Sequence, residues 1–586
     1  MKTRDLQSGP RLAFDVVTIV MKKPISAVSF LVLSAVTCLA GTDADLVRPK
    51  AGQTVEVIVQ YASIPTTEHH LRVTNRGGRV LGHYQHLPMS HYAVTPDALA
   101  SLEADKDVVS ISPNRPLKGM EDLSDYSVNF NPLNDYYNAI NRWKARGIGI
   151  AILDSGINAG HPNFNAWAST TSRIVYSESF VGGDTNDQYG HGTHVAGIAA
   201  GVDNIIAGLS NPTRWFYGIA MDANIINLKV LDGTGSGTDA SVIAGINRAI
   251  QLKSTYNIRV LNLSLGRAVY TSYKNDPLCQ AVEAAWKAGI VVTVAAGNNG
   301  RDNSQGTNGY GTITAPGNDP YVITVGAAND KSDWTRSDDV IATYSSKGPT
   351  AIDHIAKPDL LASGNRVASY QAPGAYLTTQ FPGNRFNYNA YSTSGANTPS
   401  PYYFTLSGTS MAAPFVAGAA AMLVDKDPTL TPDLIKARLM KTAWRGFPAT
   451  TSTYDPVTNT TYYGNHDLFT IGAGMVDMWA AYNSTDTSTG SAASPSAYYD
   501  SVSKTVKLNL NSTSAASVIW GTNIIWGTNL IWGTTVVNGT SVIWGTSLIW
   551  GTSSVSGFGL IWGTTSPWAQ SSAGTESLSI LANGEN

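Results

Sequence analysis

Three short segments carry, in chain order, an aspartate, a histidine and a serine among glycines and other small residues. They read AILDSGINAGHP around Asp154, YGHGTHVAGIAAG around His191 and LSGTSMAAPFVAGAA around Ser410. A serine hydroxyl becomes an effective nucleophile only when a neighbouring base removes its proton. A histidine usually serves as this base, and a buried carboxylate holds it in one tautomer. The three side chains together predict covalent catalysis by an activated serine.

The residues around the histidine and the serine are typical of helices that begin at a reactive side chain. Ser410 precedes the small run MAAP, and His191 opens the run HGTHVAGIAAG. A helix that begins at Ser410 would direct the N–H groups of its first turn toward a developing oxyanion. The small residues after His191 would let a second helix pack closely and bring the imidazole near Ser410.

Apolar runs alternate with helical patterns from about residue 135 to residue 482. GIGIAILD, ANIINLKVL, IRVLNLSLG and GIVVTVAAG are strand-like, whereas ASVIAGINRAIQLK and PLCQAVEAAWKAG are helical. This alternation predicts an α/β fold, a doubly wound and mostly parallel sheet with helices on both faces. Functional groups of such sheets lie beyond the carboxyl ends of the strands. Asp154, Ser264 and Asn298 each follow a strand, so we expect them at one edge.

The composition favours an exported globular protein and gives no basic surface for nucleic acid. Apolar residues make up 43% of the chain, charged residues 14%, and the net charge is −3. Met21 is a candidate start, because two lysines and then the apolar run 25–36 follow it as in a signal peptide. We favour secretion over a lipid anchor at Cys38. Cys279, the other cysteine, is expected to be a small buried hydrophobic residue.

The reactive segments resemble those of the subtilisin-like serine proteases, the subtilases, over roughly residues 50–482. The resemblance implies that Asp154 orients His191, that His191 acts as general base and acid, and that Ser410 is the nucleophile. Asn298, in VAAGNNG, matches the side-chain donor to the oxyanion in this family. The implied activity is that of a secreted, self-processing endopeptidase of broad specificity. Its substrates would be proteins or peptides, and its chemistry would need no cofactor.

Two further sets of residues match the family's substrate-binding site. One set resembles the edge strand that pairs with the substrate backbone, and the other resembles the walls of the primary specificity pocket. These walls carry no charge, so the resemblance implies a preference for apolar or aromatic side chains before the cleaved bond. The residues are Gly235, Ser236, Gly237, Ser264, Leu265, Gly266, Ala296 and Gly297.

Residues 50–118 show a β-α-β-β-α-β order, which is the ferredoxin-like split pattern. By resemblance, this α+β unit is an inhibitory propeptide that assists folding and that the enzyme cleaves from itself, somewhere in 115–132. A small accessory domain is the alternative that the pattern leaves open.

Several other polar residues allow two interpretations. Asp184 and Asp187 either bind a structural calcium ion, as such loops do in the family, or form a solvated acidic turn. The aromatic residues of a predicted insertion, 365–404, either line a substrate groove or cover the surface. Some histidines are expected to have only packing, surface or structural roles. They are His69, His70, His161 and His194.

The composition changes after about residue 482. A Ser/Thr-rich stretch predicts a flexible linker, and a hexapeptide IWGT repeat follows it. Seven tryptophans fall in one six-residue register, which would place them on one face of an extended strand. The repeats either contact a cell surface or polysaccharide, or form a resistant tail that is trimmed. Those tryptophans are Trp520, Trp526, Trp532, Trp544, Trp550, Trp562 and Trp568.

A second functional hypothesis makes the chain an adhesion or assembly protein whose repeats carry the function on a protease scaffold. The intact set of reactive residues weighs against it. The expected organisation is a signal-peptide region (1–40), a propeptide (41–130), a catalytic domain (131–482), a linker (483–510), the repeats (511–570) and a C-terminal tail (571–586).

Overall fold

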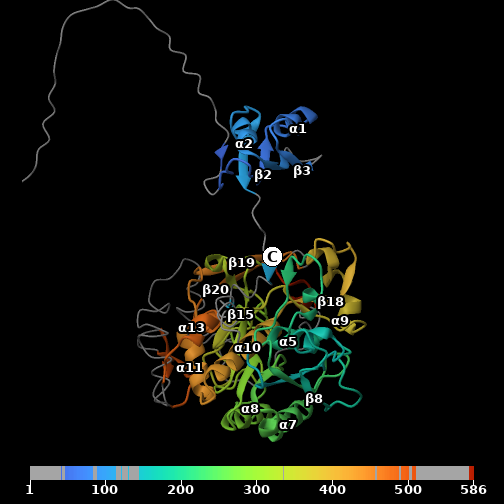
Figure 1. The fold of residues 1–586 in the computed structure, drawn as a ribbon. Coiled ribbons are helices and arrows are strands. Elements are labelled where there is room, and N and C mark those ends of the chain that lie inside the picture. Colours follow the sequence, from blue (N-terminus) through green and yellow to red (C-terminus); the bar gives the residue numbers. More distant parts are fainter. Residues whose placement is uncertain are drawn as a thin grey trace, which may run out of the picture. The chain divides into compact units, whose positions relative to one another are not determined.

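The computed structural model divides the chain into two compact units, residues 1–117 and 118–586 (Figure 1). The division falls after Leu117, rather than at residue 130. The signal-peptide region (1–40), the expected propeptide cleavage region 115–132 except for residues 120, 121, 128 and 130, and the IWGT repeats lie outside the described residues. The structure describes residues 41–42, 46–83, 89–113, 120–121, 128, 130, 144–333, 335–455, 458–487, 490–500, 505–509, 578 and 580–585.

The first unit has the predicted β-α-β-β-α-β order, preceded by a short strand. Its sheet has the order β1-β5-β2-β4-β3. Alternation in β2 buries Val57 and Val59 while Glu56 and Gln60 remain exposed, as expected for a sheet with one covered face. The elements are β1 (Gly41–Thr42), β2 (Val55–Tyr61), α1 (Thr67–Thr74), β3 (Arg79–His83), β4 (Met89–Val94), α2 (Pro96–Glu103) and β5 (Val108–Pro113).

The second unit is built on the predicted doubly wound sheet, which confirms the α/β class. The strand order is β14-β13-β12-β11-β7-β10-β8, and β15 pairs with β13. Every pairing is parallel except that of β13 with β14. The strands are β7 (Gly149–Asp154), β8 (Ile174–Ser179), β10 (Asn224–Lys229), β11 (Ile258–Leu263), β12 (Val291–Ala295), β13 (Ile323–Asn329), β14 (Val340–Ile341) and β15 (Leu360–Ser363).

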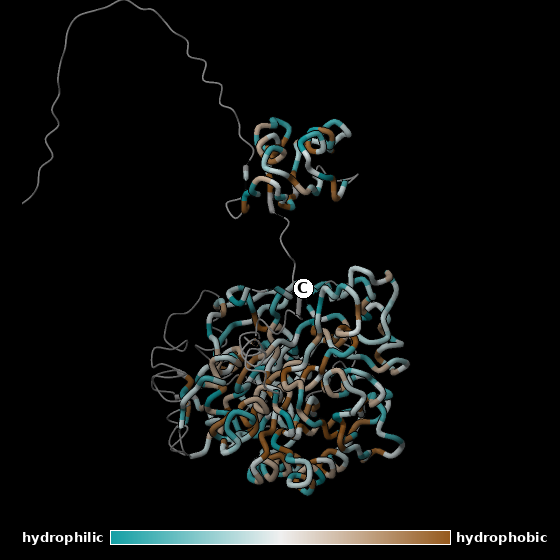
Figure 2. Tube along the Cα trace, viewed as in Figure 1, coloured by the Kyte–Doolittle hydropathy of each residue, from teal (hydrophilic) through white to brown (hydrophobic). Residues whose placement is uncertain are grey.

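The helices on this sheet form two pairs, as expected when both faces are covered. α5 (His191–Ala200) packs on α10 (Thr409–Lys426), and α7 (Asp239–Tyr256) packs on α8 (Pro277–Lys287). Close approach of α10 requires glycine at 418, because a Cβ there would lie 2.5 Å from Cβ of Ile219. Figure 2 shows apolar stretches running through the interior of this unit, where the central strands are wholly buried.

The predicted insertion, 365–404, forms a small sheet that packs beside α5. Its strands are β16 (Val367–Tyr370), β17 (Arg385–Asn387) and β18 (Pro399–Leu406), with α9 (Tyr376–Gln380) between the first two. Tyr370, Tyr391 and Tyr403 are fully buried in it. Four of the nine aromatic residues of the insertion are buried and four more pack against the core, which is neither of the two roles considered from the sequence, whereas Tyr376 is 41% exposed.

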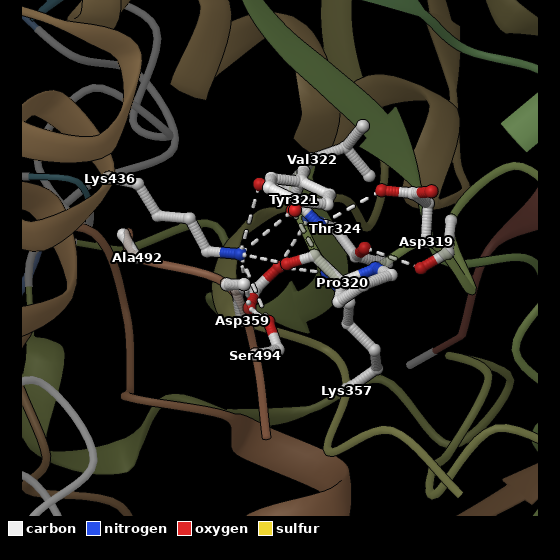
Figure 3. Close-up of polar contacts among 12 residues, drawn as sticks. Asp319, Pro320, Tyr321, Val322, Thr324, Lys357, Asp359, Lys436, Ala492 and Ser494 are labelled. Carbon is white, nitrogen blue, oxygen red and sulfur yellow. Dashed lines mark hydrogen bonds and ion pairs between the residues drawn. The ribbon is translucent and has the colours of Figure 1, made fainter. Parts of the chain in front are cut away.

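The predicted flexible linker is wrong for the residues described between 484 and 500. Ala492 and Ser494 are buried, and Ser494 Oγ donates to Asp359 at 2.5 Å. This serine closes the buried charge cluster of Lys357, Asp359 and Lys436 (Figure 3). A Ser/Thr-rich composition is typical of flexible linkers, but the Ser494 hydroxyl here satisfies buried polar groups.

The remaining elements of the second unit lie outside its main sheet. No helix among the described residues is long and apolar enough to cross a bilayer. Cys279 is a free and buried thiol, as expected. The other elements are β6 (Met120–Glu121), η1 (Pro162–Phe164), α6 (Asn204–Ala207), β9 (Arg214–Trp215), η2 (Arg336–Asp338), η3 (Pro382–Asn384), η4 (Tyr388–Ala390), α11 (Pro432–Thr442), β19 (Thr450–Asp455), β20 (Thr460–Asn465), α12 (Leu468–Ile471), α13 (Met478–Tyr482), β21 (Ser496–Asp500) and β22 (Thr505–Asn509).

Candidate active site

The aspartate and the first histidine meet at the carboxyl edge of the sheet. Asp154 ends β7 and His191 begins α5, and the His191 Nδ1 lies 2.7 Å from Asp154 Oδ1. The Ser155 backbone N–H also donates to this oxygen at 2.8 Å. An Nδ1–H that donates to the carboxylate leaves Nε2 as the ring atom able to accept a proton.

Both members of this pair are buried, since Asp154 is 1% exposed and His191 6% exposed. Burial lowers the pKa of His191, but the negative charge of Asp154, its hydrogen bond and the charge of Asp187 raise it more. The net result is a His191 pKa above its ordinary value. His191 therefore binds its proton readily and is neutral only at less acidic pH.

Asp187 holds the start of α5 through hydrogen bonds. Its carboxylate accepts hydrogen bonds from Ser155 Oγ at 2.8 Å, from the Gly190 N–H at 2.7 Å and from the Thr193 N–H at 2.8 Å. These donors fix the helix that carries His191. Sequence reasoning had considered Asp187 only as a calcium ligand or part of a solvated turn.

The solvated-turn alternative does not hold for Asp187, which is buried, whereas Asp184 is exposed and accepts from Gln188. Burial raises the pKa of Asp187. Within the part of the chain that the structure describes, no group of three or more His, Cys, Asp or Glu side chains could hold a metal ion. Calcium binding at this loop stays a prediction.

Ser410 lies in the first turn of α10, directly after the N-cap Gly408 and Thr409. The Ser410 hydroxyl donates to the Ser264 carbonyl at 3.1 Å, and Ser264 Oγ donates back to the Ser410 carbonyl at 2.7 Å. Ser410 and His191 line the same cleft. Activation would require the Ser410 hydroxyl to exchange its carbonyl partner for Nε2 of His191.

The contacts of Asn298 leave its amide N–H₂ as the donor on the cleft that Ser410 also lines. Its Oδ1 accepts from the Thr409 N–H at 2.9 Å and from Thr409 Oγ1 at 3.1 Å. The Nδ2 atom faces Gly408, where a Cβ would lie 3.1 Å away. Asn298, Ser410 and His191 line one cleft.

A buried polar chain behind Ser264 was missed by sequence reasoning. The Asn262 side chain donates to Ser264 Oγ at 2.9 Å and accepts from Thr293 Oγ1 at 3.0 Å. Asn262 and Thr293 are register partners on β11 and β12. The available signal was a polar residue in each of two otherwise apolar strands, because a buried polar side chain needs such a partner.

The cleft that joins these residues has a volume of about 390 Å³. Gly235, Ser236 and Gly237 line it, but as a turn rather than a strand, since the Ser236 N–H donates to Asp232 Oδ1 and its carbonyl accepts from the Asp232 N–H. Leu581, far along the chain, also lines it. Sequence reasoning had no signal for this leucine.

The predicted specificity walls are only partly found in the cleft. Ser264, Leu265 and Gly266 line it, whereas Ala296 and Gly297 are not among the residues that do. The Ala296 N–H donates to the Val325 carbonyl, and the Gly297 N–H donates to Thr409 Oγ1. These two residues are thus used to join neighbouring segments.

The lining of the cleft also contains charges that the predicted walls lack. Arg267 and Asp239 line it and form an ion pair at 2.7 Å. Arg267 also pairs with the fully buried Asp276 at 2.8 Å. The positive charge is therefore matched by carboxylates inside the protein.

The histidines expected to be structural have structural contacts. His194 Nε2 lies 3.1 Å from both the Val367 and the Phe404 carbonyls, and burial lowers the His194 pKa to about 3. His161 is buried and stacks on Tyr370 with ring centroids 4.8 Å apart. The neutral imidazole of His194 joins α5 to the insertion, and that of His161 joins the residue before η1 to it.

Comparison with known proteins identifies the family. The model of the subtilase family matches residues 145–503. Serine protease AprX of Bacillus subtilis (strain 168) is 36% identical over 354 residues, which are 59% of this chain and 72% of that protein. Subtilisin DY of Bacillus licheniformis is 34% identical over 303 residues, 51% of this chain and 85% of that protein.

Among solved structures, the crystal structure of a cold adapted subtilisin-like serine proteinase is 28% identical. The TM-score is 0.36, and the match covers 52% of this chain and 84% of the chain in that structure. The family match spans the strand that ends at Asp154, the helix that begins at His191 and the helix that carries Ser410. The chain therefore belongs to the subtilase family, and it is a serine endopeptidase, a hydrolase of peptide bonds.

Proposed function

We propose that Asp154, His191, Ser410 and Asn298 carry out the hydrolysis. Ser410 Oγ attacks the carbonyl carbon of the cleaved bond while His191 Nε2 takes its proton, and Asn298 Nδ2 donates to the oxyanion that forms. His191 then returns the proton to the leaving amine. Water cleaves the resulting acyl-enzyme by the same steps in reverse.

The observation that carries this proposal is the buried bond between His191 Nδ1 and Asp154 Oδ1, at 2.7 Å, beside a cleft shared with Ser410 and Asn298. A buried carboxylate that holds one tautomer stabilises the imidazolium formed during attack. No cofactor is needed for these steps. Calcium, if the loop at Asp184 binds it, would have a structural role only.

The cleft supports a preference for apolar side chains before the cleaved bond. Leu231, Val242, Leu265 and Leu278 line it, and the charge of Arg267 is already matched by carboxylates. The two glycines of the turn at 235–237 add lining without side chains, which places few demands on the substrate there. Broad specificity with an apolar preference follows.

We further propose that the enzyme is secreted and processes itself. The run after Met21 has the pattern of a signal peptide, and the first unit has the fold pattern expected of an inhibitory propeptide. The family match ends at residue 503, before the repeats, and lends the adhesion hypothesis no support. Contact of the repeats with a cell surface or polysaccharide stays a separate prediction.

Mass spectrometry of the exported protein tests catalysis and processing together. The wild type is expected to lose its signal region and first unit, whereas Ser410→Ala should accumulate as a folded precursor without peptidase activity. Processing or peptidase activity that persists in Ser410→Ala would contradict the assigned nucleophile.

A further inference from the structure

We propose that residues 580–585 are a permanent part of the active site and that Leu581 is a specificity-determining residue on the leaving-group side of the cleaved bond. This inference rests on the proposed function of the cleft. Leu581 lines that cleft together with His191, Asn298 and Ser410.

The segment is packed into the second unit rather than attached loosely to it. Ile580, Leu581 and Ala582 are each at most 8% exposed. The Gly584 N–H donates to the Ile580 carbonyl at 2.8 Å and closes the short helical turn. Gly584 has φ +62°, and a Cβ there would lie 2.5 Å from Asn365 Oδ1, so this position favours glycine.

Glu585 provides a buried anchor. Its side chain is 1% exposed and pairs with Arg301, 3% exposed, at 3.0 Å. Thr343 donates to the carboxylate from its backbone N–H at 3.1 Å and from Oγ1 at 2.6 Å. The Asn365 amide accepts from the Glu585 N–H at 2.8 Å and donates to its carbonyl at 2.7 Å.

These contacts reach the two segments that lie next to Asn298 and Ser410. Arg301 stands three residues after Asn298, and Ser407 stands three residues before Ser410. The Ser407 N–H donates to the Leu581 carbonyl at 2.8 Å. Leu581 is therefore held at a fixed place relative to the nucleophile.

The position of Leu581 indicates which part of a substrate it contacts. The acyl side of a substrate is expected along 235–237 and 264–266. Leu581 lines this cleft too, but it comes from another segment, and its carbonyl accepts from the N–H of Ser407, the residue that follows β18. The chain that continues past Ser410 as leaving group would pass this leucine.

The buried ion pair also argues against a removable plug. A segment that must leave before substrate enters would have to expose the Glu585 carboxylate and abandon Arg301 and Thr343 together. Separating a buried, hydrogen-bonded charge pair is strongly unfavourable. The anchor thus fits a wall that stays in place.

The test compares full-length wild type with Leu581→Ala on two series of internally quenched peptides. One series varies the residue after the cleaved bond, and the other varies the residue before it. Leu578→Ala is the matched control, a half-buried leucine just before this segment that does not line the cleft. Titration with a fluorophosphonate gives the concentration of reactive serine, so each kcat/KM is referred to working sites.

Leu581→Ala is expected to change relative kcat/KM within the leaving-side series by about tenfold, while the acyl-side series and Leu578→Ala keep wild-type ratios. Unchanged ratios in both series, or changes confined to the acyl side, would overturn the proposal. A uniform rise for every peptide would also overturn it, because it would show a plug.

Two further results keep the proposal falsifiable if Leu581→Ala folds poorly. Glu585→Gln, which weakens the anchor, should alter the leaving-side ratios in the same direction. Mass spectrometry of the active wild type should find residues 580–585 retained, and full activity without them would overturn the proposal. Failure of the wild type to react with the fluorophosphonate would instead contradict the proposed function itself.

Discussion

The Asp154–His191 pair and the buried charge cluster of Lys357, Asp359 and Lys436 place charges in the same interior in opposite ways. Both Asp359 oxygens are fully used, Oδ1 by Ser494 Oγ and Lys436 Nζ, and Oδ2 by Lys357 Nζ at 2.6 Å and the Thr324 N–H at 2.8 Å. Asp154 Oδ2, in contrast, is buried and has no hydrogen-bond partner among the residues that the structure describes.

The difference separates a group that holds the fold from a group that does chemistry. Lys436 Nζ also donates to the Pro320 and Val322 carbonyls at 3.0 Å, so the cluster ties several segments of the unit together. The Asp154 carboxylate instead uses Oδ1 for His191 and Ser155, and within the described part of the chain its Oδ2 accepts no hydrogen bond. An under-satisfied carboxylate retains its negative field for an imidazolium.

The largest expected effect comes from Asp154→Asn. The amide cannot hold the same tautomer of His191, so kcat should fall by about 10⁴-fold, the loss known for the equivalent change in another serine protease. The chain should stay folded, since Oδ2 has no hydrogen bond to lose. Peptide hydrolysis measures kcat, and circular dichroism measures whether the chain is folded. Loss of the fold would contradict the proposed difference between this pair and the charge cluster.

Asp359→Asn should lower the stability of the fold rather than act directly on catalysis. It leaves Lys357 and Lys436 without a counter-charge in the interior, which costs about 3–5 kcal/mol in the free energy of unfolding. Urea unfolding in the Ser410→Ala background measures this without self-digestion. Arg248→Ala is the control, because its ion pair with Glu178 has side chains 38% and 27% exposed and its loss should cost at most about 1 kcal/mol. Equal costs for the two variants would contradict the account.

Asn298→Ala removes the proposed oxyanion donor from the reactive side of the comparison. The expected loss is about 10²–10³-fold in kcat with little change in KM, a magnitude taken from subtilisin itself. The fold should persist, although the Thr409 N–H and Oγ1 lose their acceptor. Steady-state kinetics on one peptide measure kcat and KM. A rise in KM with unchanged kcat would show that Asn298 does not stabilise the transition state.

The smallest expected effect is on pH dependence. Activity requires neutral His191, whose pKa is raised above its ordinary value, so activity is present above that pKa and lost as the pH falls through it. Asp187→Asn removes one of the charges that raise the His191 pKa, and the acid limb of kcat/KM should move to lower pH. A limb that stays in place or moves to higher pH would show that Asp187 acts only through hydrogen bonds.

Much of the fold could be predicted from sequence because its signals are local. The strands before Asp154, Ser264 and Asn298 are near-continuous apolar runs that mark buried parallel strands, and residues that end parallel strands must share an edge. The glycines and alanines after His191 and Ser410 likewise report the close packing of α5 and α10.

The features missed from the sequence all join distant residues through polar or single contacts. Ser494 satisfies Asp359, and Leu581 reaches the cleft from beyond the repeats. The sequence near Ser494 or Leu581 contains no pattern that predicts these contacts. Asp187 was noticed for its charge, but its role in holding α5 depends on the three-dimensional position of Ser155 and Thr193.

The most direct test of the central claim is the site of reaction with a fluorophosphonate. In the wild type, the reagent should add once per chain, and peptide mapping should place the adduct on Ser410. Asp154→Asn should slow the addition strongly while leaving the chain folded. An adduct on another residue, or addition to wild type no faster than to Asp154→Asn, would contradict the account.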